Sequence, residues 1–169
     1  MIASEFSRPV DERQVTAKPI QLEATAEERT ALAKRFGLVA IDRLEAAVAI
    51  ERHGEALSVR GKLHAAIIQS CAVSGEDLPV TIDEPLALRF VPAGDAPAEE
   101  EIELDEGDLD EIPFEGHLFD LGEAVAQSLA LAIDPYATGP EAERVRKDGV
   151  VSDEAASGPF AALAALKKP

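Results

Sequence analysis

Residues 44–91, LEAAVAIERHGEALSVRGKLHAAIIQSCAVSGEDLPVTIDEPLALRFV, contain three runs in which apolar and polar residues alternate. A period of two places every second side chain on the same face of a β-strand, so each run predicts a strand with one buried and one wet face. Short connections that contain glycine, at residues 53–55 and 74–77, separate the runs, and such connections join antiparallel neighbours. The stretch therefore predicts a three-stranded antiparallel meander whose apolar face needs a cover.

One helix is predicted directly ahead of the meander, over residues 26–36. Thr25, with Glu28 three residues later, forms the capping-box pattern that begins helices. Gly37 stands where a C-cap glycine belongs. Further upstream, strands are predicted over residues 18–24 and, as a shorter piece, over residues 4–8.

A second helix is predicted over residues 120–134, with Asp120 as its N-cap and Pro135 as its end. Its apolar side chains share one face, which is the natural cover for the apolar face of the sheet. They are Leu121, Val125, Leu129 and Ala132. The predicted fold class is α+β: an antiparallel sheet, a meander that could curl towards a barrel, packed by two main helices.

The chain is predicted to form a single α+β domain over residues 1–137. Residues 93–116 are rich in proline, glycine and acidic residues, and no Lys or Arg occurs between Phe90 and Glu143. Self-repulsion and low hydrophobicity oppose burial of such a tract, so an acidic mobile loop is predicted there. Residues 138–169 are predicted to form a flexible tail that ends in a short apolar segment, Phe160–Leu166.

Acidic charge is concentrated in the second part of the chain. The 169 residues carry a formal net charge of −17. Residues 1–92 hold 11 Lys or Arg and 14 Asp or Glu, a net charge of −3, whereas residues 93–169 hold 5 and 19, a net charge of −14. An acidic tract repels the phosphates of nucleic acids and attracts basic partners.

The cysteine content and the N-terminal residues favour a cytoplasmic protein with no membrane partner. Cys71 is the single cysteine, so no internal disulfide is possible. No apolar run approaches the roughly 20 residues that a membrane-spanning helix needs. The first ten residues include Glu5 and Arg8 and contain no apolar signal-peptide core.

Four short motifs follow one another along the chain. They are Glu5-Phe6-Ser7-Arg8, residues 67–78 (IIQSCAVSGEDL), residues 120–136 (DLGEAVAQSLALAIDPY) and residues 159–163 (PFAAL). In this order they resemble the bacterial YceD family, over roughly residues 4–137 and the last ten residues. The resemblance implies a role in accumulation of 23S ribosomal RNA, and hence in assembly of the large ribosomal subunit, with no catalytic activity attached.

Cys71 is a candidate binding residue because the resemblance implies a Cys-x-x-Cys at this position in many members. Ser74 stands here in place of the second cysteine. A zinc site needs about four Cys or His ligands, and His64 and Cys71 face opposite sides of a regular strand. We therefore expect no metal and no cofactor. A catalytic thiol would need a nearby histidine that the sequence does not place, and glycine-rich phosphate loops are absent.

A basic stripe is predicted on the wet face of the meander. Arg60, Lys62 and His64 are alternate residues, and Arg52 lies near the adjoining turn. Such a stripe can bind phosphates, although an ordinary charged sheet surface has the same pattern. The stripe contains no aromatic side chain on which RNA bases could stack.

The sequence thus leaves two binding modes open for a non-enzymatic ribosome biogenesis factor. In one, the acidic tract and the edges of the sheet hold a basic ribosomal protein or a pre-large-subunit particle. The tract includes Glu99, Glu100, Glu101 and Glu103. In the other, the basic stripe contacts ribosomal RNA directly. A small enzyme with an unrecognised site is the alternative, although no small-molecule substrate is evident.

Overall fold

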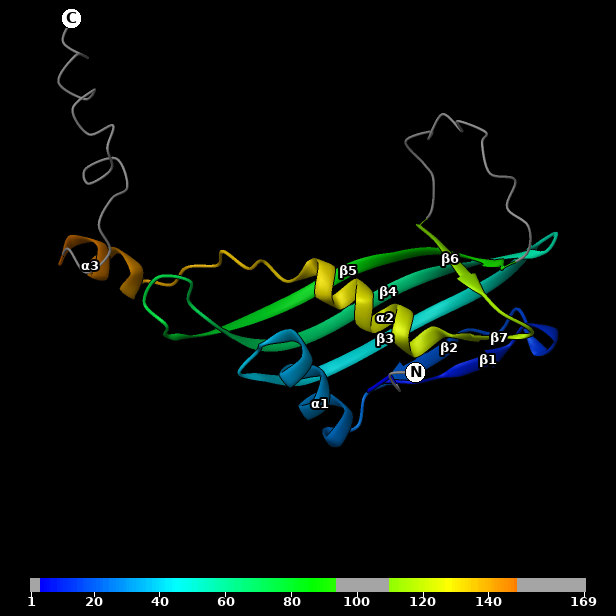
Figure 1. Cartoon of the computed structure of the whole chain (residues 1–169), viewed down its shortest axis with the longest axis horizontal. Coiled ribbons are helices and arrows are strands. Elements are labelled where there is room, and N and C mark those ends of the chain that lie inside the picture. Colours follow the sequence, from blue (N-terminus) through cyan, green and yellow to red (C-terminus); the bar gives the residue numbers. More distant parts are fainter. Residues whose placement is uncertain (1–3, 94–109, 149–169) are drawn as a thin grey trace, which may run out of the picture.

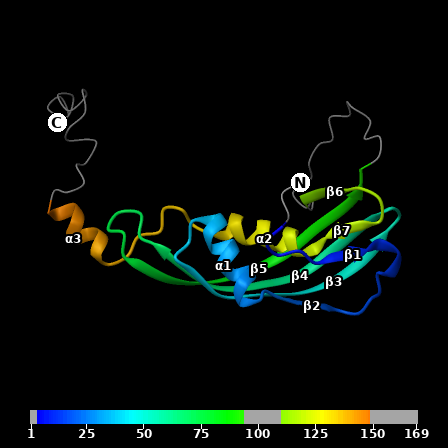
Figure 2. The same cartoon turned by 60° about the horizontal axis from the view of Figure 1, so that its bottom comes forward.

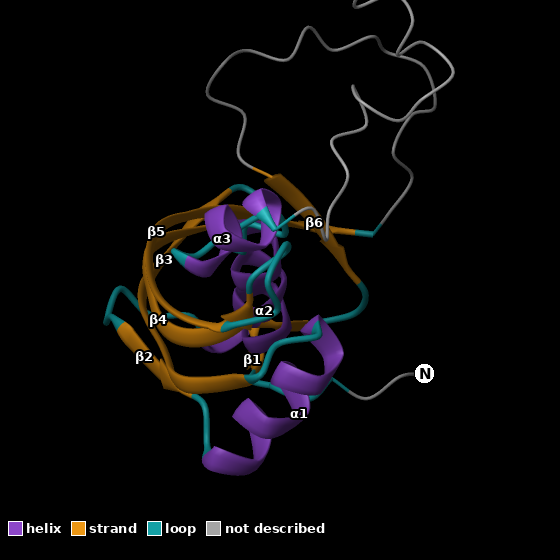
Figure 3. Ribbon diagram, turned by 90° about the vertical axis from the view of Figure 1, so that its left-hand side faces the viewer, coloured by secondary structure: helices purple, strands orange, loops and turns teal. Residues whose placement is uncertain are grey.

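A curved sheet wraps around a central helix in the computed structural model, which describes residues 4–93 and 110–148 (Figures 1 and 3). In chain order the elements are β1 (Pro9–Asp11), the 3-10 turn η1 (Glu12–Gln14), β2 (Ile20–Glu23), α1 (Ala26–Phe36), β3 (Ala40–His53), β4 (Ala56–Ser70), β5 (Asp77–Pro92), β6 (Asp110–Phe114), β7 (Leu118–Asp120), α2 (Leu121–Ala132) and α3 (Glu141–Lys147). The predicted α+β fold class is confirmed.

Five strands form the main sheet in the order β2-β3-β4-β5-β6, and β1 pairs with β7 in a separate two-stranded sheet. Pairing is antiparallel from β2 to β5, which confirms the meander of β3, β4 and β5. Strand β6 lies parallel to β5. The five strands curl around α2 without closing into a barrel (Figure 3).

The alternation predicted for the meander is confirmed by burial. On the face where apolar residues were expected, Gly61 and Val80 are half-buried and the others are buried. The buried ones are Leu44, Ala46, Val48, Ile50, Leu57, Val59, Leu63, Ala65, Ile67, Ile82, Leu86, Leu88 and Phe90. Leu121, Val125 and Leu129 of α2 each have 0% of their surface exposed and belong to the same core. Because an amphipathic helix and a half-buried sheet each need a partner, α2 covers the concave face as predicted.

Local capping determines where both main helices begin. The Thr25 hydroxyl accepts a hydrogen bond from the Glu28 N–H at 3.3 Å, and the Glu28 carboxylate accepts one from the Thr25 N–H at 2.8 Å. This capping box confirms the start of α1, and Gly37 closes the helix in a left-handed conformation with φ 67°. Asp120 caps α2 by accepting the Glu123 N–H at 3.0 Å.

The strand predicted over residues 4–8 is wrong. Residues 5 and 6 form a turn, and the strand begins at Pro9 instead of stopping before it. The backbone ahead of β1 is occupied by other partners: the Arg8 N–H binds the Asp120 carboxylate at 2.8 Å, and the Leu121 N–H donates to the Arg8 carbonyl at 3.1 Å.

The acidic loop predicted over residues 93–116 is partly wrong, because Asp110–Phe114 forms β6. Phe114 is 6% exposed and packs against Phe119, with ring centroids 5.8 Å apart, so burial of isolated apolar residues offsets the cost of ordering this segment. Residues 94–109, with Glu99, Glu100, Glu101 and Glu103, lie outside the described residues.

The segment predicted to be a flexible tail starts with a helix. Glu141–Lys147 forms α3, in which Ala142 is 2% exposed. Its first N–H group, at Glu141, donates to the Glu76 carboxylate at 2.9 Å, so the helix is attached to the turn between β4 and β5. The terminal apolar segment, Phe160–Leu166, lies outside the described residues.

Candidate binding surfaces

The convex face of the sheet carries part of the predicted basic stripe. Both α1 and α2 lie on the other side of the sheet (Figures 2 and 3), so within the described residues no helix covers this face. Arg60 lies between Ala49 and Ala87 on the neighbouring strands, and Lys62 lies between Ala47 and Pro85. Both cations are exposed and form no ion pair with another described residue. Their cross-strand neighbours are all small, so both cations stand out from the surface of the sheet.

His64 continues the stripe in position but is flanked by carboxylates. Its Nδ1 atom contacts Asp83 Oδ1 on β5, and Glu45 is its partner on β3. Phosphate binding at this end would therefore compete with two acidic neighbours. The cationic part of the stripe reduces to Arg60 and Lys62.

Arg52 does not join the stripe. It faces the same side of β3 as the buried Ile50, and its guanidinium donates to the Glu12 carbonyl and lies 3.6 Å from the Glu12 carboxylate. His117 contacts the same carboxylate at 2.7 Å. The hydrogen bond from His117, and then Arg52, lower the pKa of Glu12. These contacts fasten the β3–β4 hairpin to η1 and to the β6–β7 turn.

Cys71 is the centre of a hydrogen-bonded turn at the end of β4. Its side chain is buried, and its sulfur accepts the N–H groups of Ser74 and Gly139, each at 3.3 Å. The turn is attached to the chain after α2, since the Ala72 N–H donates to the Ala137 carbonyl at 3.0 Å. The motif at residues 67–78 and the segment that follows α2 are therefore hydrogen-bonded to each other. We call such an attachment between distant segments a joint.

The surroundings of Cys71 favour its thiolate form. Hydrogen bonds from the Ser74 hydroxyl and the Ser74 N–H, followed by that of Gly139, lower the pKa of Cys71 from 9.0 to about 6, although burial opposes the shift. The Ser74 hydroxyl has one proton and also lies 3.1 Å from Glu76 Oε1, so the backbone N–H groups are the dependable donors. No three Cys, His, Asp or Glu side chains are grouped to hold a metal ion within residues 4–93 and 110–148.

The N-terminal segment, residues 4–8, and the α2 motif form a second joint, which the sequence did not reveal. The Ser4 hydroxyl donates to Glu123 at 2.6 Å, and the Ser7 hydroxyl donates to Asp120 at 2.6 Å. A Cβ atom on Gly122 would lie 2.9 Å from the Arg8 nitrogen, so glycine is needed for the close approach of the two backbones. The order of the motifs along the chain contained no signal for this pairing.

Arg8 extends this joint to α1. Its guanidinium forms two hydrogen bonds with the Glu28 carboxylate, at 2.7 and 2.9 Å, and lies 4.5 Å from the centre of the Phe6 ring. The bidentate Arg8 contact lowers the pKa of Glu28 to about 2. Three of the four motifs therefore hold the molecule's own segments together, and the fourth lies outside the described residues.

The fold and these joints define a small α+β protein. Its sequence motifs hold different segments of the same chain together. The family model for YceD, described as large ribosomal RNA subunit accumulation protein, matches residues 59–167. The chain belongs to this family, as the motifs suggested. No curated protein and no solved structure matches the chain. Within the described parts, no helix is long and apolar enough to cross a membrane.

Proposed function

We propose that this chain is a non-enzymatic, cytoplasmic assembly factor of the large ribosomal subunit that supports accumulation of 23S ribosomal RNA by holding a basic ribosomal protein. The family description supports the ribosomal role. The distribution of charge supports the mode of action, because a net charge of −3 over residues 1–92 is followed by −14 over residues 93–169. Long-range attraction to such a flank speeds capture of a basic protein.

Release of the bound ribosomal protein follows from the same electrostatic attraction. Ribosomal RNA is a denser polyanion than this chain, so it competes for the basic protein once the two meet. Binding to a −17 chain is sensitive to salt, because screening weakens interactions between exposed charges beyond about one Debye length, ~8 Å at physiological ionic strength. A carrier of this kind delivers its cargo without needing a catalytic step.

Direct contact with ribosomal RNA is the second candidate, and Arg60 and Lys62 favour it, because they stand exposed and without an ion-pair partner among the described residues. Arg52 and His64 do not strengthen it, since each already contacts an acidic residue. Two cations supply few phosphate contacts compared with the 6–10 or so that give strongly salt-dependent nucleic-acid binding. The protein-holding mode is therefore the one we favour.

A deletion strain complemented with two charge variants separates the modes. The first variant neutralises the acidic tract at Glu99, Glu100, Glu101, Glu103, Asp105, Glu106, Asp108 and Asp110. The second changes Arg60 and Lys62 to Gln, and its matched control changes Lys18 and Lys34 to Gln. The readouts are the 23S ribosomal RNA level, the ratio of large to small subunits, and co-sedimentation of the chain with pre-large-subunit particles.

We expect the acidic-tract variant to fail in complementation and the Arg60/Lys62 variant to restore large subunits almost as well as the parent. The reverse result would assign the function to RNA contact. Full complementation by both variants would show that neither the acidic tract nor the Arg60/Lys62 surface carries the function. Turnover of a small molecule by the purified chain would instead support an enzyme and contradict the proposal.

A further inference from the structure

Glu84 interrupts the apolar inner column of β5. Its neighbours on that face, Ile82 and Leu86, are buried, and Glu84 itself pairs across the sheet with the buried Leu63. The Glu84 side chain is nevertheless exposed, and no hydrogen bond or ion pair joins it to another described residue. A carboxylate stands where the alternation of the strand would otherwise place a core residue.

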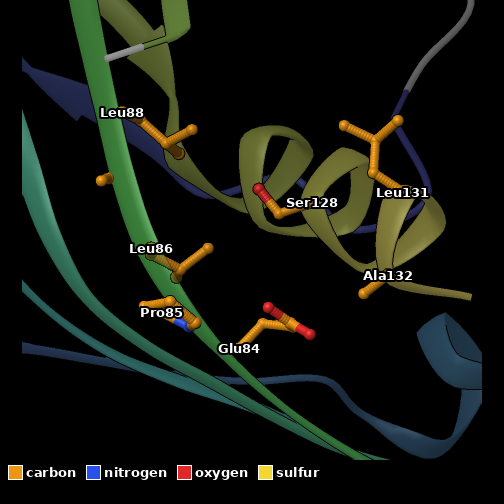
Figure 4. Close-up of a pocket in the computed structure, with 8 residues that line it drawn as sticks. Glu84, Pro85, Leu86, Leu88, Ser128, Leu131 and Ala132 are labelled. Carbon is orange, nitrogen blue, oxygen red and sulfur yellow. The ribbon is translucent and has the colours of Figure 1, made fainter. Parts of the chain in front are cut away.

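Glu84 lines a groove of about 310 Å³ between β5 and the last turns of α2 (Figure 4). The α2 side is formed by Ser128, Leu131 and Ala132, and the Glu84 carboxylate points from β5 towards them. Leu131 is 83% exposed, so it adds accessible apolar surface beside the buried Leu86 and Leu88. The Ser128 hydroxyl donates to the Ala124 carbonyl at 2.9 Å and so serves its own helix.

The free edge of β5 beside this groove is not suited to binding a long additional strand. Strand β6 pairs only with Leu88–Pro92, so the edge from Asp77 to Ala87 has no second strand among the described residues. Pro79 and Pro85 lie on this edge strand and have no N–H group to donate. Prolines on an edge strand oppose pairing with another chain, so side-chain contacts and not strand pairing are left for recognition at this edge.

We propose that the α2–β5 groove seats a basic protein segment in which a bulky apolar residue lies next to a Lys or Arg. The apolar side chain packs on Leu131 and Ala132, above the buried Leu86 and Leu88 that line the groove, and the cation pairs with Glu84. The occupant is chosen by charge complementarity, since the Glu84 carboxylate has no ion-pair partner among the described residues and the chain has a net charge of −17. This inference rests on the proposed function and names the contact surface for the basic ribosomal protein.

The test measures binding of two short labelled peptides to the full chain by fluorescence anisotropy. One peptide alternates leucine and lysine, and the other has serine in place of every leucine, so their charges are equal. Glu84→Gln and Leu131→Ser probe the groove. Glu55→Gln and Val39→Ser are matched controls, because Glu55 is an exposed acid in the β3–β4 turn and Val39 is an exposed apolar residue beside α1.

Each groove variant should weaken binding of the leucine–lysine peptide by about tenfold and leave the serine–lysine peptide unchanged, as expected for a central contact of an interface. The two control variants should bind like the parent. If all variants bind the leucine–lysine peptide equally well, the groove is not the contact surface, while salt-sensitive binding of both peptides would still support the proposed function. If neither peptide binds, both proposals fail.

Two further outcomes would also overturn the groove assignment. Tighter peptide binding by a Leu166→Ser chain would assign the groove to the protein's own terminal segment, which also joins a leucine to two lysines. Loss of binding to a single-stranded RNA oligonucleotide in Glu84→Gln or Leu131→Ser would make the groove part of an RNA surface.

Discussion

Arg35 of α1 forms two hydrogen bonds with the Glu123 carboxylate of α2, at 2.8 and 3.0 Å, although the residues are 88 positions apart. The same guanidinium donates to Glu5 at 2.9 Å. One side chain thus joins the N-terminal segment and both helices of the concave side. The pKa of Glu123 falls to about 2, chiefly through the Arg35 hydrogen bonds, and that of Arg35 is raised.

A double-mutant cycle on Arg35→Gln and Glu123→Gln should show coupling of about 1–2 kcal/mol in the free energy of unfolding at neutral pH, because the pair is bidentate and partly buried. Urea unfolding measures it. The matched control is the same cycle on Arg146→Gln and Glu143→Gln, since that pair is exposed on both sides and is worth little. Additive effects of Arg35→Gln and Glu123→Gln would show that the contact does not stabilise the fold.

The contribution of Glu123 has a defined dependence on pH. Its pKa is lower in the folded chain, about 2 against 4.5, so the stabilisation is complete above pH 4.5 and is lost as the pH falls towards 2. The difference in unfolding free energy between the parent and Glu123→Gln should therefore shrink over this range. A constant difference would mean that Glu123 is not held as a carboxylate by Arg35.

Gly122→Ala should destabilise the protein by about 1–3 kcal/mol, because the new methyl group would press on the backbone of residues 6–8. Helix propensity alone predicts the opposite sign, a gain of about 1 kcal/mol for alanine over glycine inside a helix. Ala130→Gly, at an exposed position of α2, should show only that propensity term. A higher melting temperature for Gly122→Ala would refute the close approach.

Val125→Asp should cost several kcal/mol of stability, because Val125 is 0% exposed and the new carboxylate would be buried without a partner. Gln127→Asp introduces the same side chain on the exposed side of α2 and is the control. Thermal unfolding of the two variants measures the difference. Equal melting temperatures would place Val125 on the surface, in conflict with α2 as the cover of the sheet.

The pKa of Cys71 should lie well below 9.0, at about 6, because its sulfur accepts hydrogen bonds from the Ser74 hydroxyl and from the Ser74 and Gly139 N–H groups. Its ultraviolet thiolate absorbance reports this directly, with Cys71→Ala as the blank. A lowered pKa in the folded state also means that the stabilisation is full above pH 9, declines below it and is lost near pH 6. The stability gap between the parent and Cys71→Ala should therefore widen with rising pH, and a gap independent of pH would contradict it.

The sequence by itself determined the parts of this protein that follow from local patterns. Alternation with a period of two identified the meander and its buried face, and the capping box at Thr25 and Glu28 identified the start of α1. These features can be recognised in the sequence because side chains on one face of a strand or helix recur every two to four residues. Burial of that face therefore places apolar residues at regular intervals along the chain. The motif order also identified the family.

The tertiary structure alone decided which distant segments bind one another. Asp120 is an N-cap that sequence reasoning could find, but its contacts with Ser7 and Arg8 depend on how the N-terminal segment docks on α2. In the same way, the pairing of β6 and the turning of Arg52 towards Glu12 depend on the curvature and register of the whole sheet. Such contacts join residues that are dozens of positions apart. The local sequence around one residue does not indicate which distant residue it will contact.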